Sequence, residues 1–275
     1  VSKVLYLAEC LGNKIIVLGD CFSHKQLIQG KALNFLYERI QNSNLEYWIM
    51  VGNHDWYSTE CKEHSLQVFS KSENGNIIDE PWKFEREKML LLPYYHDLEQ
   101  FKAVVKNHNP EILFIHQGVN GYKFHNNRIE DTSVNVDIFK DIPLVISGHF
   151  HGYQKINNVT YLGTPFTIDF GESGQTKYIG VLDTDTRDMQ LIETKLPKHI
   201  TYTVDCNQTT KLAPGTTAND GDYIRVILTG KSSSIERFDA STIPSGAKLV
   251  IQAIDTVEEV AVKETQTNEE KWASY

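Results

Sequence analysis

Four short apolar stretches of this chain each lead directly into side chains that can bind a metal ion. In residues 46–57, a run from Tyr47 to Val51 ends at a glycine and is followed by Asn53, His54 and Asp55. Three more stretches repeat this design: residues 14–20, 112–116 and 144–151. Open α/β sheets collect their functional groups at the carboxyl ends of their strands. The pattern therefore predicts an α/β fold in which these four strand ends meet at one site.

The order of elements supports a parallel sheet. Helical periodicity in residues 1–11 precedes a strand at 15–18, and a helix over 25–42 leads into the strand at 47–51. A strand-helix-strand order implies a right-handed crossover and a parallel pair. Further elements are expected as follows: strands at 82–84, 89–94, 112–116 and 144–147, a helix at 97–108, and a short helix near 136–139.

Three segments are expected to be less regular or differently paired. Residues 58–80 are polar and punctuated by Gly and Asn, which predicts a surface excursion, and 117–137 predicts a loop. Val159–Leu162 and Tyr178–Asp183 are expected to be antiparallel strands, joined by the segment 163–172.

The pattern changes around Pro197, which predicts a second domain. Residues 200–205, 222–229 and 247–254 alternate between apolar and polar side chains, with polar turns between them. We expect a core domain over 1–196 and a small α+β domain over 197–256. Residues 257–275 are expected to form an acidic tail.

Composition excludes some classes of protein. No apolar run approaches the roughly 20 residues of a membrane span, and the N-terminus lacks the layout of a signal peptide. The four cysteines have no pair spacing, which favours free thiols in a reducing cytoplasm. The net charge of −9 argues against a globally basic nucleic-acid binder but does not exclude DNA, since bound cations reverse the local field.

Five side chains at the strand ends form a ligand set for divalent cations: Asp20, Asn53, His116, His149 and His151. Carboxylate, carboxamide and imidazole groups suit Mn, Fe or Zn. The Asp20 carboxylate can bridge two ions about 3.5–4 Å apart, which together orient a water and stabilise charge on a phosphate. His149 and His151 are two residues apart. In a strand their side chains would share one face, whereas on a turn they could bind different metal ions.

Each of these residues alone also has an ordinary structural explanation. A Gly-Asp pair after a strand is usually a turn, and Gly-Asn-His-Asp fits a helix N-cap or an Asx turn. His116 alone is more often a satisfied core histidine, and Gly-His-Phe-His fits a tight turn. Their occurrence together, each after an apolar strand, favours the metal site.

His54 and Asp55 are the candidate catalytic residues. His54 need not be a ligand and is better suited to donate a hydrogen bond to the phosphate or the leaving oxygen, because imidazole titrates near neutral pH. Asp55 is expected to hold the His54 ring in place.

These motifs resemble the calcineurin-like metallophosphoesterases, whose pattern is Asp-x-His, Gly-Asp, Gly-Asn-His-Asp/Glu, a lone His and Gly-His-x-His. Four of the five blocks stand here in order: Gly19-Asp20, Gly52–Asp55, His116 and Gly148–His151. The segment Tyr161–Glu172 looks like the SbcD-type DNA double-strand-break repair nucleases, and Ser-Gly-His-Phe-His with Gly-Thr-Pro-Phe is closest to the tailed-phage branch. The resemblance covers roughly residues 1–255.

The resemblance implies a layered α/β/β/α sandwich core with a small α+β capping domain that helps to select DNA. It implies that Asp20 bridges two divalent metal ions, with manganese as the first choice and Mg, Fe or Zn as alternatives. Asn53, His116 and His149 would hold one ion and His151 the other, while His54 stabilises the transition state with Asp55 behind it. The implied partners are DNA, an SbcC-type ATPase subunit and a second copy of the chain in a homodimer.

One block of the family pattern, Asp-x-His on an opening strand, has no counterpart in residues 1–13. We expect that a short N-terminal piece with this block precedes Val1 in the natural protein, and that partner-binding helices follow the cap. Without the block, the metal site of His151 is incomplete.

Three functions compete at this point. The first is a metal-dependent DNA nuclease subunit, and the second is a small-molecule phosphodiesterase or phosphatase on the same fold. The third is a non-catalytic assembly subunit with an incomplete metal site. The presence of the 197–256 domain disfavours the second, because a small substrate does not need such a cap.

Overall fold

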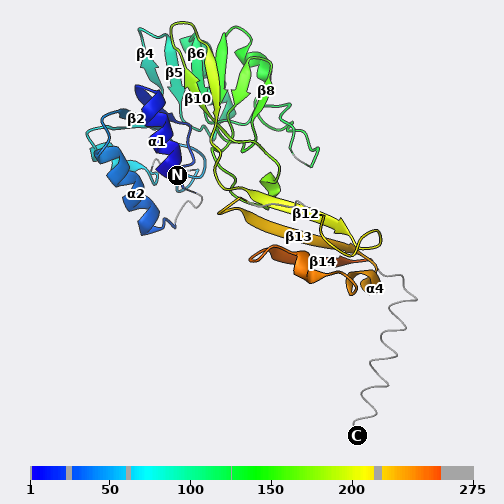
Figure 1. Cartoon of the computed structure of the whole chain (residues 1–275). Coiled ribbons are helices and arrows are strands. Elements are labelled where there is room, and N and C mark those ends of the chain that lie inside the picture. The colour runs from blue at the N-terminus through cyan, green and yellow to red at the C-terminus, as the bar shows by residue number, and fades with distance from the viewer. Residues whose placement is uncertain (1, 23–26, 60–62, 125, 214–218, 255–275) are drawn as a thin grey trace, which may run out of the picture. The chain divides into compact units, whose positions relative to one another are not determined.

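The computed structural model describes residues 2–22, 27–59, 63–124, 126–213 and 219–254 (Figure 1). The chain divides into two compact units. The core unit comprises Val1–Phe166 and Gln175–Lys195, and the second unit comprises Thr167–Gly174 with the chain from Leu196 onward. The predicted tail, 257–275, lies outside the described residues. None of the helices that the structure describes is long and apolar enough to cross a bilayer.

The first sheet of the core unit is parallel, as the strand-helix-strand order predicts. It contains β1 (Lys14–Val17), β2 (Glu46–Met50) and β3 (Gly75–Ile78), in that spatial order. Helices α1 (Ser2–Leu11) and α2 (Gly30–Gln41) cover one face, where Leu5 and Ile40 pack against Tyr47 and Ile49. A polar contact ties the layer together, because the Tyr47 hydroxyl donates to Glu9 Oε1 at 2.6 Å and Arg39 pairs with the same carboxylate.

The second sheet has six strands in the order β4-β5-β6-β7-β9-β8. Their bounds are as follows: β4 Trp82–Phe84, β5 Met89–Leu92, β6 Ile112–Ile115, β7 Leu144–Ser147, β8 Gln154–Ile156 and β9 Val159–Tyr161. β5, β6, β7 and β9 are parallel to one another, while the edge strands β4 and β8 pair antiparallel with β5 and β9. Helix α3 (Leu98–His108) and the 3-10 turn η2 (Val136–Phe139) cover the outer face, with Phe101 and Phe139 against Leu113 and Val145.

Alternation along the strands explains the layering. In β2, Tyr47 and Ile49 face the helices, while Trp48 and Met50 enter the cluster between the two sheets. The same cluster receives alternate residues of β5, β6 and β7, such as Leu91. Strands that are apolar at every position are therefore buried on both faces, and the layers follow the order α/β/β/α.

Helix α3 shows how local sequence sets its ends. The Asp97 side chain accepts hydrogen bonds from the backbone N–H groups of Glu99 and Gln100, at 2.8 and 3.1 Å. Asn109 closes the helix in the left-handed region, with φ of 41°. An Asp N-cap and an Asn at the C-terminal cap are typical helix boundaries, so the predicted helix over 97–108 is confirmed.

Two sequence-based expectations about strands are wrong. Residues 58–80 are not only a surface excursion, because Leu66, Phe69 and Ile78 are buried and β3 completes the first sheet. The strands near 159–162 and 178–183 do not pair with each other. β9 lies between β7 and β8, while β10 (Tyr178–Leu182) forms an antiparallel hairpin with β11 (Met189–Glu193).

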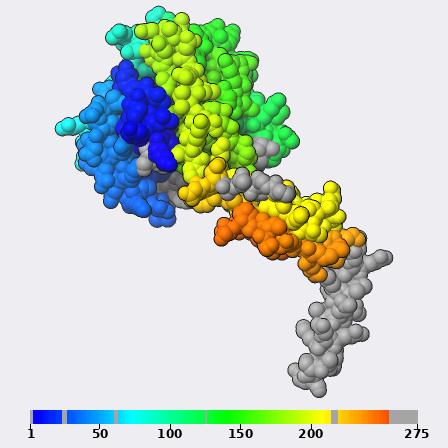
Figure 2. All heavy atoms as spheres, viewed as in Figure 1, coloured from blue at the N-terminus to red at the C-terminus, as the bar shows by residue number. Residues whose placement is uncertain are grey.

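The β10–β11 hairpin adds a further piece to the core unit. In the space-filling view, the dark-blue helix α1 lies between the lighter blue of α2 and the yellow-green of this hairpin (Figure 2). α1 contacts both β1 and β10. Leu182 and Met189 of the hairpin also pack against the cluster between the two sheets. The hairpin thus extends the middle of the sandwich.

The second unit is built on a three-stranded parallel sheet in the order β12-β13-β14. Its strands are β12 (His199–Asp205), β13 (Tyr223–Gly230) and β14 (Lys248–Ala253). One face buries Val204 and Val226 against Phe238 and Ile243, near the short helix α4 (Ser232–Ile235) and the 3-10 turn η4 (Ala240–Thr242). The fold class is therefore a layered α/β/β/α sandwich with an additional small α+β unit.

Candidate metal centre

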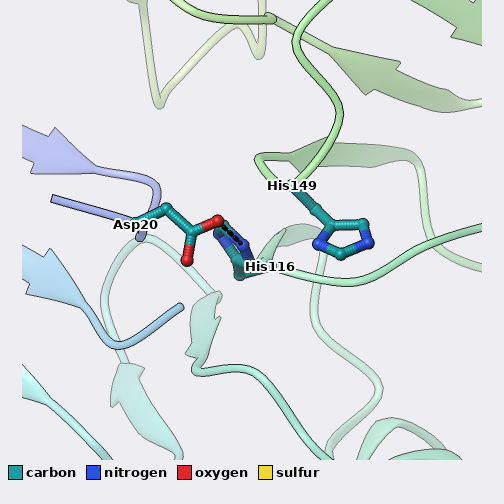
Figure 3. A group of neighbouring side chains, drawn as sticks. All are labelled: Asp20, His116 and His149. Carbon is teal, nitrogen blue, oxygen red and sulfur yellow. Dashed lines mark ion pairs between the residues drawn. The ribbon is translucent and has the colours of Figure 1, made fainter. Parts of the chain in front are cut away.

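The strand ends of the core unit bring three predicted ligands together. Asp20 follows β1, His116 follows β6 and His149 follows β7, and one ligand atom of each lies within 4.8 Å of those of the others. Figure 3 shows the Asp20 carboxylate directed at the His116 ring, with His149 beside them on the adjoining loop. The ligands therefore converge at the carboxyl edges of the two sheets, as the sequence predicts.

Glycines before the ligands allow the loops to approach this closely. A Cβ on Gly52 would overlap the backbone nitrogen and the carboxylate of Asp20, and a Cβ on Gly148 would overlap the carbonyl oxygen of Leu18. Asp20 and His149 themselves have positive φ values, 53° and 76°. Such backbone angles are uncommon for residues other than glycine and are characteristic of functional turns.

His116 is oriented by its own hydrogen bond. Its Nδ1 donates to the carbonyl oxygen of Leu18, and its side chain is almost fully buried. A neutral imidazole that donates through Nδ1 keeps its lone pair on Nε2. This Nε2 lies 3.1 Å from Asp20 Oδ2 and 3.1 Å from Asn53 Oδ1. Without a metal, Nε2 can carry a proton that it donates toward these two oxygens. A bound cation would take the place of that proton and use the lone pair of Nε2 instead.

Asn53 joins the cluster through its side-chain oxygen. Asn53 Oδ1 lies 2.9 Å from Nδ1 of His149 as well as near His116. Burial lowers the pKa of His149 to about 4, and the charge of His116 acts in the same direction. His149 is therefore neutral at physiological pH, which is the form that binds metal.

Asp20 remains ionised in spite of its burial. Burial alone would raise the pKa of its carboxyl, but the hydrogen bond and charge of His116 and the backbone N–H of His54 outweigh this effect, and the pKa is lowered. Oδ1 accepts the His54 N–H at 2.8 Å, while Oδ2 faces His116. One oxygen of Asp20 is thus used to order the neighbouring loop.

Asp55 connects the loops after β1 and β2. Its Oδ2 accepts the backbone N–H groups of Asp20 and Gly52, at 2.8 and 2.9 Å, and Oδ1 lies 3.4 Å from the Ser65 hydroxyl. The side chain is fully buried, and burial raises its pKa to about 6. No hydrogen bond joins Asp55 to the His54 ring among the described residues. The expectation that Asp55 holds this ring is therefore replaced by a role in holding Asp20.

His54 is exposed at the same edge of the core unit. Its backbone N–H is bound to Asp20, which fixes the position of its Cα relative to the ligands. An exposed imidazole next to a ligand cluster is free to meet a substrate from solution.

His151 does not belong to the cluster formed by Asp20, His116 and His149. Its side chain is exposed, and its backbone carbonyl is held in the core unit. That carbonyl accepts the Thr164 N–H at 3.0 Å and the Lys177 ammonium at 2.8 Å. The Gly-Thr-Pro-Phe segment, residues 163–166, therefore fixes the loop that carries His149 and His151.

Two residues near the site were not anticipated from the sequence. Tyr94 follows β5, and its ring stacks on His149, with centroids 6.0 Å apart and planes inclined by 23°. Lys177 is almost fully buried and also donates to Thr164 Oγ1 and Gln175 Oε1. Tyr94 could have been found, because it too follows the carboxyl end of a parallel strand. No sequence signal marks Lys177.

The donor set fits a divalent cation. The carboxylate and carboxamide oxygens are hard ligands and the two imidazole nitrogens are borderline ligands, a mixture that Mn, Fe and Zn accept. The ligands are already held in place, by Leu18 for His116 and by Asp55 for the backbone of Asp20. Supported ligands of this kind are characteristic of metal sites. A divalent cation would be held by Asp20, Asn53, His116 and His149.

Comparison with known families identifies a match that covers the metal cluster. The model of the calcineurin-like phosphoesterase family matches residues 6–172, which is more than half of the chain. This range includes all the residues of the cluster and the Gly-Thr-Pro-Phe segment.

Two relatives cover most of the chain. Exonuclease subunit 1 of Enterobacteria phage T4 is 24% identical over 279 residues, which span 94% of this chain and 79% of that protein. A putative phosphoesterase of Invertebrate iridescent virus 6 is 27% identical over 229 residues, which span 78% of this chain and 79% of that protein. A solved structure described as a novel archaeal phosphodiesterase has a TM-score of 0.38 and 16% identity, over 70% of this chain and 90% of that one. That likeness is too weak to add to the comparison.

Proposed function

The chain belongs to the calcineurin-like phosphoesterase family, and on that premise we propose that it is the metal-dependent nuclease subunit of an SbcC–SbcD-type DNA-processing complex. It hydrolyses phosphodiester bonds of DNA with a metal-activated water. The observation that carries the proposal is the convergence of Asp20, Asn53, His116 and His149 at one edge of the core unit.

DNA as the substrate is supported by the relative from phage T4, which is described as an exonuclease subunit. The similarity spans 94% of this chain, so it extends beyond the core unit into the second unit. We assign the second unit, over 197–256, the role of selecting DNA. The word subunit in the relative's name supports a partner, which we propose to be an SbcC-type ATPase, and we propose that the chain forms a homodimer in the cytoplasm.

The proposed site holds two divalent ions, with manganese as the first choice. When bound, the ions lower the pKa of a water molecule and neutralise charge on the phosphate. Asp20, Asn53, His116 and His149 would hold the first ion, and Asp20 and His151 would contribute to holding the second. The lone pairs of the first position are already in place, since Leu18 fixes the tautomer of His116.

We assign the role of general acid to His54. Its exposed imidazole donates a hydrogen bond to the phosphate or to the leaving oxygen, which is general-acid work suited to neutral pH. Asp55 supports this role indirectly, because it fixes Asp20, and Asp20 in turn binds the His54 backbone. The site thus orders His54 through its backbone and leaves its ring available.

A small-molecule phosphodiesterase is the second candidate, favoured by the relative from Invertebrate iridescent virus 6, which is described as a putative phosphoesterase. Incubation with Mn and end-labelled linear DNA, beside bis(p-nitrophenyl) phosphate, separates the two. Degradation of DNA supports the nuclease. Hydrolysis of the small ester without any degradation of DNA would contradict the nuclease function.

A non-catalytic assembly subunit is the third candidate, because the described residues gather ligands into a single cluster. Counting the ions bound per chain by inductively coupled plasma mass spectrometry tests it. Two ions per chain support the two-metal nuclease. One ion or none, together with no hydrolysis of either substrate, favours an assembly role.

The role of His54 is tested by His54→Ala. Hydrolysis should fall by about 100- to 10,000-fold, as is usual for loss of a general acid, while bound metal is retained. His108→Ala is the matched control, since His108 lies on α3 and its Nδ1 lies 2.8 Å from the carbonyl oxygen of Val104 on the same helix. Full activity of His54→Ala would show that the proposed role is wrong.

A further inference from the structure

One face of the sheet in the second unit is covered only in part by the described residues, because Phe170 lies against His199 and Arg225 but leaves Tyr223 largely exposed. Along β13, Ile224, Val226 and Leu228 are buried, while Tyr223 and Arg225 on the opposite face are exposed or half-buried. Parallel sheets are normally covered on both faces. Here α4, η4 and their neighbours cover only the side of Val226. The face that carries Tyr223 and Arg225, which we name the open face, therefore needs an explanation.

The open face carries a row of stacked rings. His199 of β12 and Tyr223 of β13 are cross-strand neighbours, and their rings stack with centroids 4.7 Å apart and planes inclined by 13°. Phe170 meets the His199 ring edge-on at 5.0 Å. Tyr223 is 60% exposed, because the pairing of β14 begins only at Arg225, opposite Lys248. A large aromatic ring is thus fixed on one side by His199 and presented to solvent.

Two cations lie next to this row. Arg225 and Lys248 are paired residues on neighbouring strands of the open face. The guanidinium of Arg225 lies 4.7 Å from the centre of the Phe170 ring and donates to Thr201 Oγ1 at 3.0 Å. Neither cation has a carboxylate partner among the described residues. An arginine that is positioned by a ring and a hydroxyl, without an acid beside it, is suited to bind an anion such as phosphate.

We propose that the open face binds an unpaired DNA strand. A base stacks on Tyr223, and the neighbouring phosphates contact Arg225 and Lys248. Aromatic platforms flanked by cations are a general solution for single strands, because every base offers a stacking face and every linkage a charge. The inference rests on the proposed function and specifies its substrate: DNA with an unpaired end or segment.

The test measures binding without cleavage. A fluorescein-labelled oligothymidylate of about 12 nucleotides is titrated with the full chain in the presence of a chelator, and the anisotropy is recorded. Tyr223→Ala should weaken binding by about 5- to 100-fold, the range for loss of one stacked base. Tyr223→Phe should bind like the unchanged protein, because the ring is retained. Arg225→Ala should weaken binding and reduce its dependence on salt.

The matched control is Ile251→Ala. Ile251 is 58% exposed and pairs with Leu228, so it belongs to the same sheet but to the opposite face. Its loss should leave the affinity unchanged. Equal binding by the unchanged protein and Tyr223→Ala would overturn the proposal, as would an equal loss in Tyr223→Phe and Tyr223→Ala.

The outcome is separable from that of the nuclease assignment. Hydrolysis of bis(p-nitrophenyl) phosphate by Tyr223→Ala should be normal, since the ester reports only on the metal site. If the unchanged protein binds the oligonucleotide through Tyr223 but cuts no DNA, the open face is supported and the nuclease function fails. If it binds no oligonucleotide, the open face is wrong whatever the ester assay shows. Binding of polyglutamate that needs Arg225 but not Tyr223 would identify an acidic protein partner and would also overturn it.

Discussion

The two units of this chain use parallel sheets in opposite ways. In the core unit, all four residues of β6 are buried, because helices cover one face and the other sheet covers the second. In the second unit, β13 alternates between buried and partly exposed residues, because only one face is fully covered. Candidate functional side chains accordingly lie beyond the strand ends in the core unit and along the strands in the second unit.

The comparison shows where a sheet can offer chemistry. A strand buried on both faces can present functional groups only in the loop that follows it, as Asp20, His116 and His149 do. A strand with one open face can present them from its own alternate positions, as Tyr223 and Arg225 do. Whether both faces of a parallel sheet are covered therefore decides whether its functional residues lie in the loops after the strands or along the strands themselves.

The strongest test of this separation is Asp20→Asn. Loss of the carboxylate should reduce ester and DNA hydrolysis by more than about 100-fold, because even outer partners of metal ligands are worth 10- to 100-fold. Bound metal should fall as well. Binding of the oligonucleotide in chelator should not change, because Asp20 belongs to the core unit only.

The control for this variant is Asp185→Asn, in an exposed turn of the β10–β11 hairpin. It should keep full activity and metal content. Loss of oligonucleotide binding in Asp20→Asn would show that the metal site of the core unit and the open face of the second unit do not function independently.

Lys177→Met tests the support of the histidine loop. Removal of the buried ammonium leaves the His151 carbonyl without its 2.8 Å donor and loosens the loop that carries His149. We expect hydrolysis to fall by about 10- to 100-fold, with weaker metal binding, in a protein that still folds. Lys155→Met, at an exposed lysine of β8, should have no effect. Unchanged metal affinity in Lys177→Met would mean that Lys177 does not position the ligands.

The sequence predicted the layered fold and the meeting of Asp20, His116 and His149 because both depend on simple patterns, but it also placed His151 in that cluster, where the structure does not group it. Apolar strands followed by Gly and a polar residue identify strand ends, which topology then brings to one edge. The partner strands of β9 and β10 could not be predicted. The sequence of Val159–Tyr161 is equally compatible with a position beside β7, where it lies, and with a position beside β10. β3 was missed because its short run, Gly75–Ile78, lies within polar surroundings.

Side-chain partners were harder to predict than elements. Asp55 was expected to orient His54, but two backbone N–H groups compete for its carboxylate and are closer along the folded loops. Lys177 lies 26 residues from His151, and only the folded chain brings its ammonium to that carbonyl. Such contacts depend on loop geometry, which periodicity does not encode.

A pair of neighbouring substitutions in β13 sharpens the distinction between its two faces. Val226 is fully buried and Ile227 is only partly buried. Val226→Thr places a hydroxyl in the core and should cost about 1–3 kcal/mol of unfolding free energy. Ile227→Thr on the open face should cost less than about 1 kcal/mol. Urea unfolding followed by circular dichroism measures both, and equal costs would mean that the open face is covered.

Tyr94→Leu addresses the site at a finer level. Its ring stacks on His149, and aromatic pairs of this kind contribute about 0.5–1.5 kcal/mol. We expect a reduction of about 2- to 10-fold in the rate of ester hydrolysis, and Tyr94→Phe should be nearly unaffected because the ring is kept. An equal loss in both variants would assign the effect to the hydroxyl instead of to stacking.

The smallest effect concerns His64 and the pH dependence of the core unit. Burial lowers the pKa of His64 below its ordinary value of 6.5, and the hydrogen bond to Asp79 offsets this only in part. A lowered pKa means that the unfolded chain takes up a proton more readily than the folded one. The stability from the neutral ring is therefore present above about pH 6.5 and is lost as the pH falls toward the folded value.

The unfolding free energy should thus decrease from pH 7 to pH 5 more steeply in the unchanged protein than in His64→Gln. Tryptophan fluorescence can follow it, since Trp48, Trp56 and Trp82 all lie in the core unit. Asp55 acts in the opposite direction, because a pKa raised to about 6 gives stability that is present at low pH and lost as the pH rises through 6. Only the difference between the two proteins therefore isolates His64. Parallel pH profiles of the two proteins would show that His64 does not contribute.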